Sequence, residues 1–74
     1  MYIKLSQPEA YAMYPFEHRI GNQVRVGGDI GTIVEGHFTG SENAGSYKIT
    51  YDIQVQNGGL VPADEANLEK IPNA

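Results

Sequence analysis

The stretch SYKITYDIQV (46–55), preceded by QVRVGGDIGTIVEGHF (23–38), decides the fold of this chain. Large apolar or aromatic residues alternate with polar ones from Tyr47 to Val55. A period of two residues is typical of a β-strand that buries one face and exposes the other. The side chains that we expect on the buried face are Tyr47, Ile49, Tyr51, Ile53 and Val55. The sequence therefore predicts an antiparallel meander with one buried face.

Glycine and proline divide residues 21–71 into short elements. We expect strands at Gln23–Gly27, Ile30–Phe38, Tyr47–Gln56, Leu60–Val61 and Leu68–Ile71, with Pro62 ending the fourth. Paired glycines accept positive φ without steric cost, which favours tight turns at 27–29 and 57–59. The remaining connections are an exposed, mobile loop over Thr39–Ser46 and one helical turn over Ala63–Asn67.

The second of these strands carries apolar residues on both faces. We expect Ile30, Val34 and Phe38 on one face and Ile33 on the other. Two glycines, Gly31 and Gly36, interrupt the strand, and glycine marks bends and bulges. This pattern is typical of a strongly bent barrel strand.

Residues 1–20, which we call the arm, precede these strands, and residues 72–74 form a tail. Met1–Leu5 alternates weakly and predicts an edge strand. A short helix over Pro8–Met13 is expected next, with Ser6 as its cap. The helix must end before Pro15, because the residue ahead of a proline avoids the helical region. The arm is rich in aromatic residues, so we expect it to fold over one opening of the barrel or to dock onto a neighbouring subunit.

The length and composition limit what this chain can be. A single domain of 74 residues buries roughly 60 to 65 % of its unfolded surface, so its core is small. The chain has no cysteine, which excludes disulfides and thiolate zinc sites, and we expect neither a metal nor a cofactor. No apolar run approaches the ~20 residues of a membrane span, and the start MYIKLSQPEA lacks the layout of a signal peptide. We expect a soluble, cytoplasmic protein without a membrane partner.

The charge distribution argues against direct binding of nucleic acid. The formal net charge is −4, and the five basic residues are dispersed along the chain. Binding to phosphates needs clustered lysine and arginine. The half that begins at Glu35 is the more acidic one, so its charge is expected to set a preference for a basic protein partner.

The order of the expected elements resembles that of SH3-like small barrels. Five short strands with one helical turn between the fourth and fifth are typical of that class. The resemblance is carried by VRVGGDIGTIVEG (24–36), YKITYD (47–52) and GGLVPADEANLEKI (58–71). It implies an all-β fold: an SH3-like five-stranded small barrel over residues 21–71, with a single helical turn before the last strand. It is specific for architecture and says little about function.

Among these barrels, the chain is distantly similar to the plasmid-borne type II dihydrofolate reductases. The similarity is carried by the opening Gly21–Arg25 and the ending Leu68–Ile71. In those enzymes a tetramer forms a central pore that binds folate and the nicotinamide cofactor. Their pore is lined by a valine-glutamine-isoleucine-tyrosine run, where this chain has Leu60–Ala63. No site residue of the family carries over, so the resemblance supports the barrel and argues against the reductase.

Histidines and aromatic residues are the candidates for a site. We interpret His18, which follows Glu17, and His37, which lies near Glu35, as ordinary surface or edge residues. Exposed aromatic rings can bind a proline-rich peptide or enclose a methylated side chain, although tyrosines of a small core are mostly packing residues. The candidate binding residues are Tyr11, Tyr14, Phe16, Tyr47 and Tyr51.

The sequence contains no motif for a nucleophile or for phosphate binding, so the leading hypothesis is a non-enzymatic SH3-like module. It would bind another protein or associate with itself, using a free sheet edge and the loop 39–46. Its size suits a small bacterial, plasmid or phage accessory protein. The alternatives are a diverged pore-forming reductase of the type II class and an acidic mimic of nucleic acid.

Overall fold

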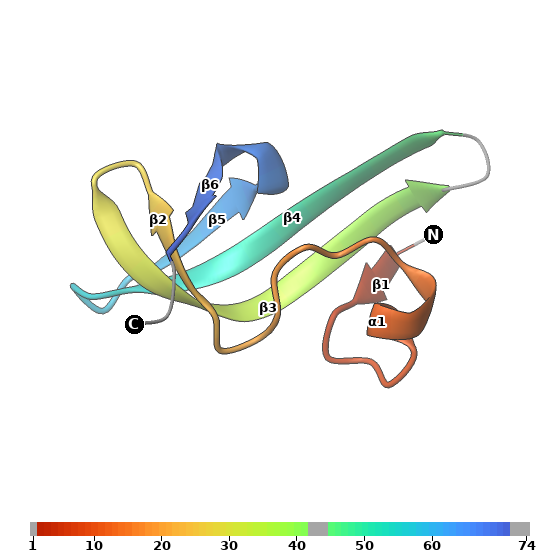
Figure 1. The fold of residues 1–74 in the computed structure, drawn as a ribbon, viewed down its shortest axis with the longest axis horizontal. Coiled ribbons are helices and arrows are strands. Elements are labelled where there is room, and N and C mark those ends of the chain that lie inside the picture. Colours follow the sequence, from red (N-terminus) through yellow and green to blue (C-terminus); the bar gives the residue numbers. More distant parts are fainter. Residues whose placement is uncertain (1, 42–44, 72–74) are drawn as a thin grey trace.

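The computed structural model describes residues 2–41 and 45–71, and it is built around one antiparallel sheet (Figure 1). Its elements are β1 (Tyr2–Lys4), α1 (Ala10–Met13), β2 (Gln23–Val26), β3 (Asp29–Ser41), β4 (Ser46–Val55), β5 (Leu60–Asp64), the 3₁₀ turn η1 (Glu65–Asn67) and β6 (Leu68–Lys70). The sheet has the order β5-β4-β3-β2-β6, and β1 pairs with β3. The predicted all-β meander is therefore confirmed.

The sheet is open in the described part of the chain. Its edge strands β5 and β6 are joined by η1, and they do not pair with each other. Strands β2 and β1 pair one after the other with β3, at Asp29–Thr32 and at His37–Thr39. Because β4 occupies the other side of β3, the two short strands share a single edge. The sequence predicts a closed five-stranded barrel, whereas the described sheet is not closed. The arm adds a sixth strand, β1.

A β-bulge interrupts the pairing of β3 with β4. Ile33 lies opposite Ile53, but Glu35 lies opposite Asp52, so Val34 is an extra residue on β3. A bulge of this kind bends its strand and increases the local twist. The long hairpin of β3 and β4 is therefore bent at Val34.

The bulge also changes which side chains of β3 share a face. Ile33 and Phe38 are both fully buried on the inner face, although five positions separate them, while Val34 is 41 % exposed. We expected Val34 and Phe38 on one face and Ile33 on the other, and this prediction is wrong. The strict period of two applies only on each side of the inserted residue.

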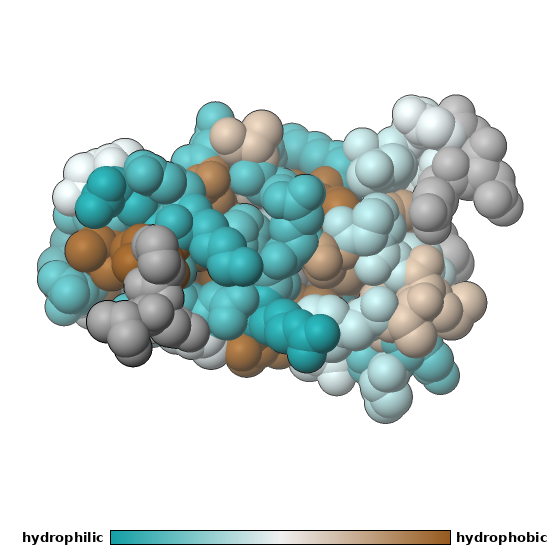
Figure 2. All heavy atoms as spheres, in the orientation of Figure 1, coloured by the Kyte–Doolittle hydropathy of each residue, from teal (hydrophilic) through white to brown (hydrophobic). Residues whose placement is uncertain are grey.

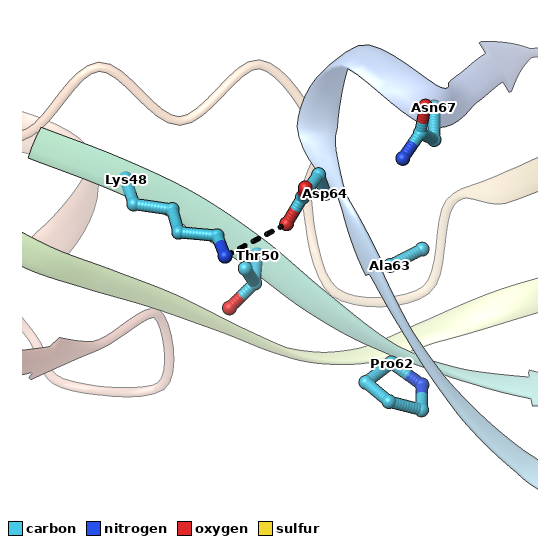
Figure 3. A pocket seen from close by; sticks show the side chains of 6 residues that line it. All are labelled: Lys48, Thr50, Pro62, Ala63, Asp64 and Asn67. Carbon is cyan, nitrogen blue, oxygen red and sulfur yellow. Dashed lines mark ion pairs between the residues drawn. The ribbon is translucent and has the colours of Figure 1, made fainter.

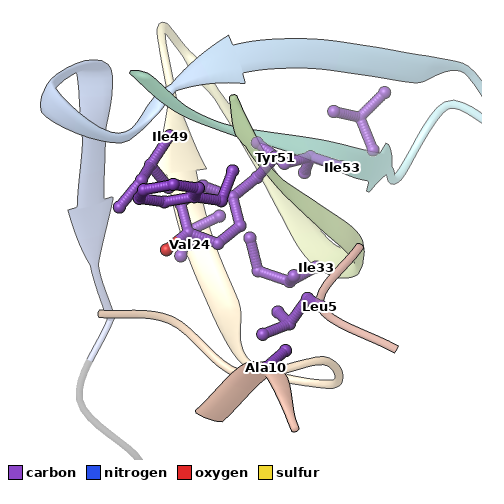
Figure 4. Close-up of a cluster of buried hydrophobic side chains, with 9 residues drawn as sticks. Leu5, Ala10, Val24, Ile33, Ile49, Tyr51 and Ile53 are labelled. Atoms are coloured by element: carbon purple, nitrogen blue, oxygen red, sulfur yellow. The ribbon is translucent and has the colours of Figure 1, made fainter. Parts of the chain in front are cut away.

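The core lies on the inner face of the sheet and is completed by the arm (Figure 4). Its buried members are Leu5, Ala10, Val24, Ile33, Phe38, Ile49, Tyr51, Ile53 and Val55. Gly36 permits the contact with the arm, because a Cβ atom there would lie 3.0–3.1 Å from Leu5 and 3.1 Å from Tyr51. Of the two alternatives for the arm, the structure shows it packed on its own chain.

Tyr47 does not belong to this core. Four of the five inner side chains predicted for β4 are buried, but Tyr47 is 46 % exposed. It lies on the part of β4 that extends beyond the end of β5. In the view of Figure 2, hydrophobic residues form small separate patches among hydrophilic ones.

The structure corrects two predictions: the end of the fourth predicted strand at Pro62 and the extent of the loop over Thr39–Ser46. Strand β5 continues through Pro62 to Asp64, because a proline is tolerated on an edge strand where its missing N–H faces no partner. Residues 39–41 and Ser46 belong to β3 and β4 and not to a mobile loop, and residues 42–44 lie outside the described residues. The tail 72–74 and Met1 also lie outside them.

The predicted helix of the arm forms, but in a shorter version. It covers Ala10–Met13 and has Glu9 at its N-cap position, so Ser6 does not cap it. Tyr14 adopts an extended conformation (φ −129°, ψ 147°), as expected for a residue that precedes Pro15. The arm nevertheless contributes Leu5 and Ala10 to the core, which makes it part of the folded unit.

We expect Leu5→Ala to lower the free energy of unfolding by about 2–4 kcal/mol, because the substitution leaves a cavity between the arm and the sheet. Urea denaturation followed by circular dichroism measures this change. Leu60→Ala is the control, since Leu60 is 57 % exposed and its loss should cost less than about 0.5 kcal/mol. Equal effects of the two substitutions would show that the arm does not share the core.

Candidate functional site

Strand β4 is longer than the neighbour that covers its outer edge. The pairing of β4 with β5 ends where Thr50 lies opposite Asp64. On its other side β4 remains paired with β3 as far as Ser46, opposite Ser41. Residues 46–49 of β4 therefore have a partner strand on one side only, as the course of β4 past β5 in Figure 1 shows. We call residues 46–49 the open edge.

The backbone groups of the open edge have a defined direction. In an antiparallel ladder, alternate residues direct their N–H and C=O groups toward alternate neighbours. The N–H of Val55 donates to the carbonyl of Gly59 (2.9 Å), on the side of β4 away from β3. Every second residue of β4 shares this direction. Tyr51 therefore directs its backbone N–H and C=O groups toward β5, and Ile49 and Tyr47 direct theirs toward the open edge. No described residue of β5 lies opposite Tyr47, whereas Glu65, which follows the extended Asp64 (φ −72°, ψ 148°), occupies the position opposite Ile49.

The hydrogen bond between the arm and β3 supports the same direction for the backbone groups of β4. The carbonyl of Gly36 accepts a hydrogen bond from the N–H of Leu5 (2.7 Å), on the side of β3 away from β4. Gly36 lies opposite Tyr51. In an antiparallel ladder, the backbone N–H and C=O groups of two directly opposite residues point either toward each other or away from each other. Tyr51 therefore also points away from β3, which places Tyr47 and Ile49 in the same orientation.

The side chains of the open edge differ between its two faces. On the inner face, the half-exposed ring of Tyr47 stacks on Phe38 with 5.1 Å between ring centroids and an interplanar angle of 21°. Ile49 is buried next to it. On the outer face, Lys48 extends its ammonium group to within 3.5 Å of an Asp64 carboxylate oxygen. The edge thus offers an aromatic surface on one face and a cation on the other.

A groove of about 380 Å³ lies where β5 ends beside β4 (Figure 3). It is lined by Lys48, Thr50, Pro62, Ala63, Asp64 and Asn67. The ion pair of Lys48 and Asp64 is solvent-exposed, and such pairs contribute about 0–1 kcal/mol, so it can rearrange readily. The groove combines an ammonium, a carboxylate, a hydroxyl and an amide, which together can donate hydrogen bonds to a polar ligand and accept them from it.

Two of the predicted binding residues meet near the open edge. Tyr14 packs on Phe38 with 4.7 Å between ring centroids, and Phe38 stacks on Tyr47. The structure therefore brings Tyr14 and Tyr47 into one aromatic group through Phe38. Sequence reasoning did not include Phe38 because the register of β3 against β4 depends on the bulge.

The other three predicted binding residues lie elsewhere. Phe16 contacts the edge of the buried Tyr51 ring, with centroids 6.2 Å apart. Tyr11 accepts a hydrogen bond from the N–H of Ile20 (3.0 Å), and the guanidinium of Arg19 lies 4.8 Å from the centre of its ring. The structure does not bring these three residues to the open edge.

The buried hydroxyl of Tyr51 connects β4, η1 and the arm. It donates to Glu65 of η1 (2.6 Å) and accepts from the backbone N–H groups of Glu17 and His18 (3.2 Å each). Burial raises the pKa of Tyr51, and the Glu65 carboxylate raises it further, so the hydroxyl remains protonated as a donor. Tyr51 is therefore a support that holds η1 against β4.

His18 is buried, which corrects its interpretation as a surface residue. Only 4 % of it is exposed, and its ring packs edge-on against Tyr51 with centroids 5.2 Å apart. Its Nδ1 has no hydrogen-bond partner among the described residues. The residue lies in the core because its own backbone N–H binds Tyr51, a contact that no local sequence pattern indicates.

Two hydrogen-bonded groups tie the arm to the outer face of the sheet. His37 bonds through Nδ1 to the hydroxyl of Tyr2 and through Nε2 to Asp52 (2.8 Å). The Glu35 carboxylate accepts two hydrogen bonds from Ser6, one from its hydroxyl (2.6 Å) and one from its backbone N–H (2.9 Å). No group of three or more histidine, aspartate or glutamate side chains suited to hold a metal ion occurs within residues 2–41 and 45–71.

The arm contact changes the acidity of Glu35. Burial alone would raise the pKa of Glu35, but hydrogen bonds from the Ser6 hydroxyl, from the Gly36 N–H and from the Ser6 N–H, with the charge of nearby His37, lower it. A lowered pKa means that the ionised carboxylate is preferred in the folded chain. The contact between Ser6 and Glu35 therefore stabilises the arm mainly when Glu35 is ionised.

Comparisons with protein-family models, with curated protein sequences and with solved structures find no match for this chain. No helix in the described part of the chain has the length and apolar character needed to cross a membrane.

We expect Tyr51→Phe to lower the free energy of unfolding by about 1–3 kcal/mol, because the buried His18 N–H loses its partner, and Glu65 and the Glu17 N–H each lose one of theirs. Urea denaturation at neutral pH measures the change. Tyr11→Phe removes an exposed hydroxyl that accepts one hydrogen bond and should cost less than about 1 kcal/mol. If both variants unfold at the same urea concentration, Tyr51 is not the support described above.

A second prediction concerns pH. The folded-state pKa of Glu35 is lowered, so its contribution to stability is present above the ordinary value of 4.5 and is lost as the pH falls through the folded-state pKa. Ser6→Ala should therefore destabilise the chain at about pH 7 by a few tenths of a kcal/mol, since solvent weakens the bond, and by less at about pH 3. Unfolding of both proteins in urea at the two pH values tests this. In a Glu35→Gln background the effect of Ser6→Ala should not depend on pH, and a pH dependence that persists there would assign it to another group.

Proposed function

We propose that this chain is a non-enzymatic, SH3-like protein-interaction module that binds an extended segment of another protein at the open edge of β4. The observation that carries this proposal is the direction of the Tyr47 backbone groups, which face no strand of the described chain. Unpaired N–H and C=O groups on a sheet edge form a template for an added strand. At this edge Tyr47 provides both a donor and an acceptor.

The lengths of the surrounding elements support this use of the edge. On the opposite side of the same hairpin, β1 pairs with His37–Thr39 and covers the edge of β3. The edge of β4 has no corresponding cover among the described residues, although Tyr47 is half exposed there. The groove at the end of β5 adjoins the edge and extends the surface that a bound segment would contact.

The charge of Lys48 favours a different protein over a second copy of this chain. A symmetric antiparallel pairing about Lys48 would place Tyr47 of one copy opposite Ile49 of the other, where Glu65 already lies. The two Lys48 residues then lie directly opposite each other in a close pair, and like charges in this position are destabilising. The order β5-β4-β3-β2-β6, with η1 before β6, supports the SH3-like part of the proposal.

We expect Tyr47→Pro to abolish binding of an added strand. The Tyr47 N–H faces the open edge, so proline removes an outward donor without removing a hydrogen bond between β3 and β4. The measurement is selection of phage-displayed random peptides on the immobilised chain, followed by fluorescence titration of synthetic versions of the selected peptides.

Tyr47→Val is the matched control, because it keeps the N–H and the strand propensity and removes only the ring. It should bind the same peptides more weakly but measurably. Peptides that bind wild type and Tyr47→Pro equally would contradict strand addition at this edge. Light scattering of the free chain at increasing concentration reports self-association. If the wild-type chain forms a stable dimer and Tyr47→Pro is monomeric, the partner at this edge is a second copy of the chain and not a different protein.

A further inference from the structure

We infer that Asn57, in the turn between β4 and β5, is a site of spontaneous deamidation, and that its isoaspartate product opens this turn. Asparagine is a thermolabile residue, and glycine follows Asn57, whereas alanine, glutamine or leucine follows each of the other asparagines. Glycine places no side chain beside the backbone nitrogen that must react. The turn lies at the opposite end of β4 from the open edge (Figure 1), so the inference does not depend on the proposed function.

The turn holds the reacting groups in an open position. The N–H of Gly58 donates to the carbonyl of Val55 (3.0 Å), and the N–H of Val55 donates to the carbonyl of Gly59 (2.9 Å). Gly58 has a φ of 93°, as is typical of the residue that closes a short hairpin loop. Asn57 and both glycines are exposed, and nothing lies within 4 Å of the position that a Cβ atom on Gly58 would take. The Asn57 side chain therefore has room to reach the Gly58 nitrogen.

One hydrogen bond prepares the Asn57 amide for attack. Its Oδ1 accepts from the N–H of Gly59 (3.1 Å), one residue beyond the nitrogen that reacts. This contact folds the side-chain carbonyl over the Gly58 peptide, and it places a donor on the oxygen that becomes negative when the carbonyl carbon is attacked. The Gly58 N–H must first leave the Val55 carbonyl, but water readily replaces an exposed hydrogen bond of this kind.

The reaction needs only hydroxide and water. Hydroxide removes the proton from the Gly58 nitrogen, which then attacks the side-chain carbonyl carbon of Asn57. The new C–N bond closes a succinimide ring, and the bond to the side-chain nitrogen breaks, so that this nitrogen takes up a proton from water and leaves as ammonia. Water then opens the ring. Attack at the side-chain carbonyl gives aspartate, and attack at the backbone carbonyl gives isoaspartate, whose main chain runs through the former side chain.

The two products should differ in stability. Aspartate keeps an oxygen for the Gly59 N–H and is itself a favoured turn residue. Isoaspartate adds one methylene to the main chain, which separates the Gly58 N–H from the Val55 carbonyl. This turn sets the register of β5, whose pairing with β4 begins at the next residue, Leu60. The isoaspartate product therefore loosens β5 from β4.

The test is incubation of the folded chain at mildly alkaline pH, followed by digestion and mass spectrometry of each asparagine-containing peptide. We expect Asn57 to deamidate several-fold faster than Asn22 and Asn67, with more isoaspartate than aspartate when the product is labelled by an isoaspartyl methyltransferase. Asn57→Gln is the matched control, because its longer side chain must close a larger ring, and it should remain unmodified. A rate at Asn57 no higher than at Asn22 or Asn67 overturns the inference.

A second measurement tests the opening of the turn. Ion-exchange chromatography separates the deamidated products, and urea denaturation measures the stability of each. Asn57→Asp carries the same added charge on a normal backbone and should unfold close to the urea concentration of wild type, whereas the isoaspartate product should unfold at a lower one. If the isoaspartate product and Asn57→Asp unfold at the same urea concentration, the turn does not open and this part of the inference is wrong.

Discussion

The pairing of β3 with β4 is the interaction on which the rest of this structure depends. The ladder runs from Gly31 opposite Val55 to Ser41 opposite Ser46, and every other strand is attached to it directly or through β2. The extra residue at Val34 bends the ladder and lets its two halves direct apolar side chains into one core. Without this insertion, every inward side chain beyond it would point to the outer face, because a shift of one residue exchanges the two faces of a strand.

The unequal lengths of the strands connect this hairpin to the proposed function. Both edges of the hairpin extend beyond β2 and β5, and exposed strand edges promote unwanted pairing. The chain covers one of them with β1, whose attachment uses Tyr2, Ser6 and the core residue Leu5. The other edge keeps a lysine at its centre, a residue that discourages pairing between identical chains. An edge that is protected against itself but otherwise accessible is suited to a partner of complementary charge.

The sequence predicts the parts of this arrangement that depend on local patterns. The period of two in residues 47–55, the glycine turns and the extended residue before Pro15 each reflect a constraint that acts over a few positions. The bulge at Val34 and the burial of His18 depend on contacts between distant segments, so no local pattern reveals them. The sequence predicts Tyr47 as a site residue because of its ring, whereas its proposed role depends on its backbone, because the end of β5 leaves that backbone without a neighbouring strand.

The core tyrosine of β4 also fixes the turn at which β5 ends. Asp64 is extended (φ −72°, ψ 148°), so Glu65 follows it to the position opposite Ile49 and begins η1 there. The Glu65 carboxylate accepts a hydrogen bond from the buried Tyr51 hydroxyl and another from the backbone N–H of Glu17. These bonds hold η1 against β4, so no strand of the described chain follows Glu65 along the edge at Tyr47. The same side chain therefore fills the core and anchors the turn beside the proposed binding edge, which links the stability of this small domain to its proposed function.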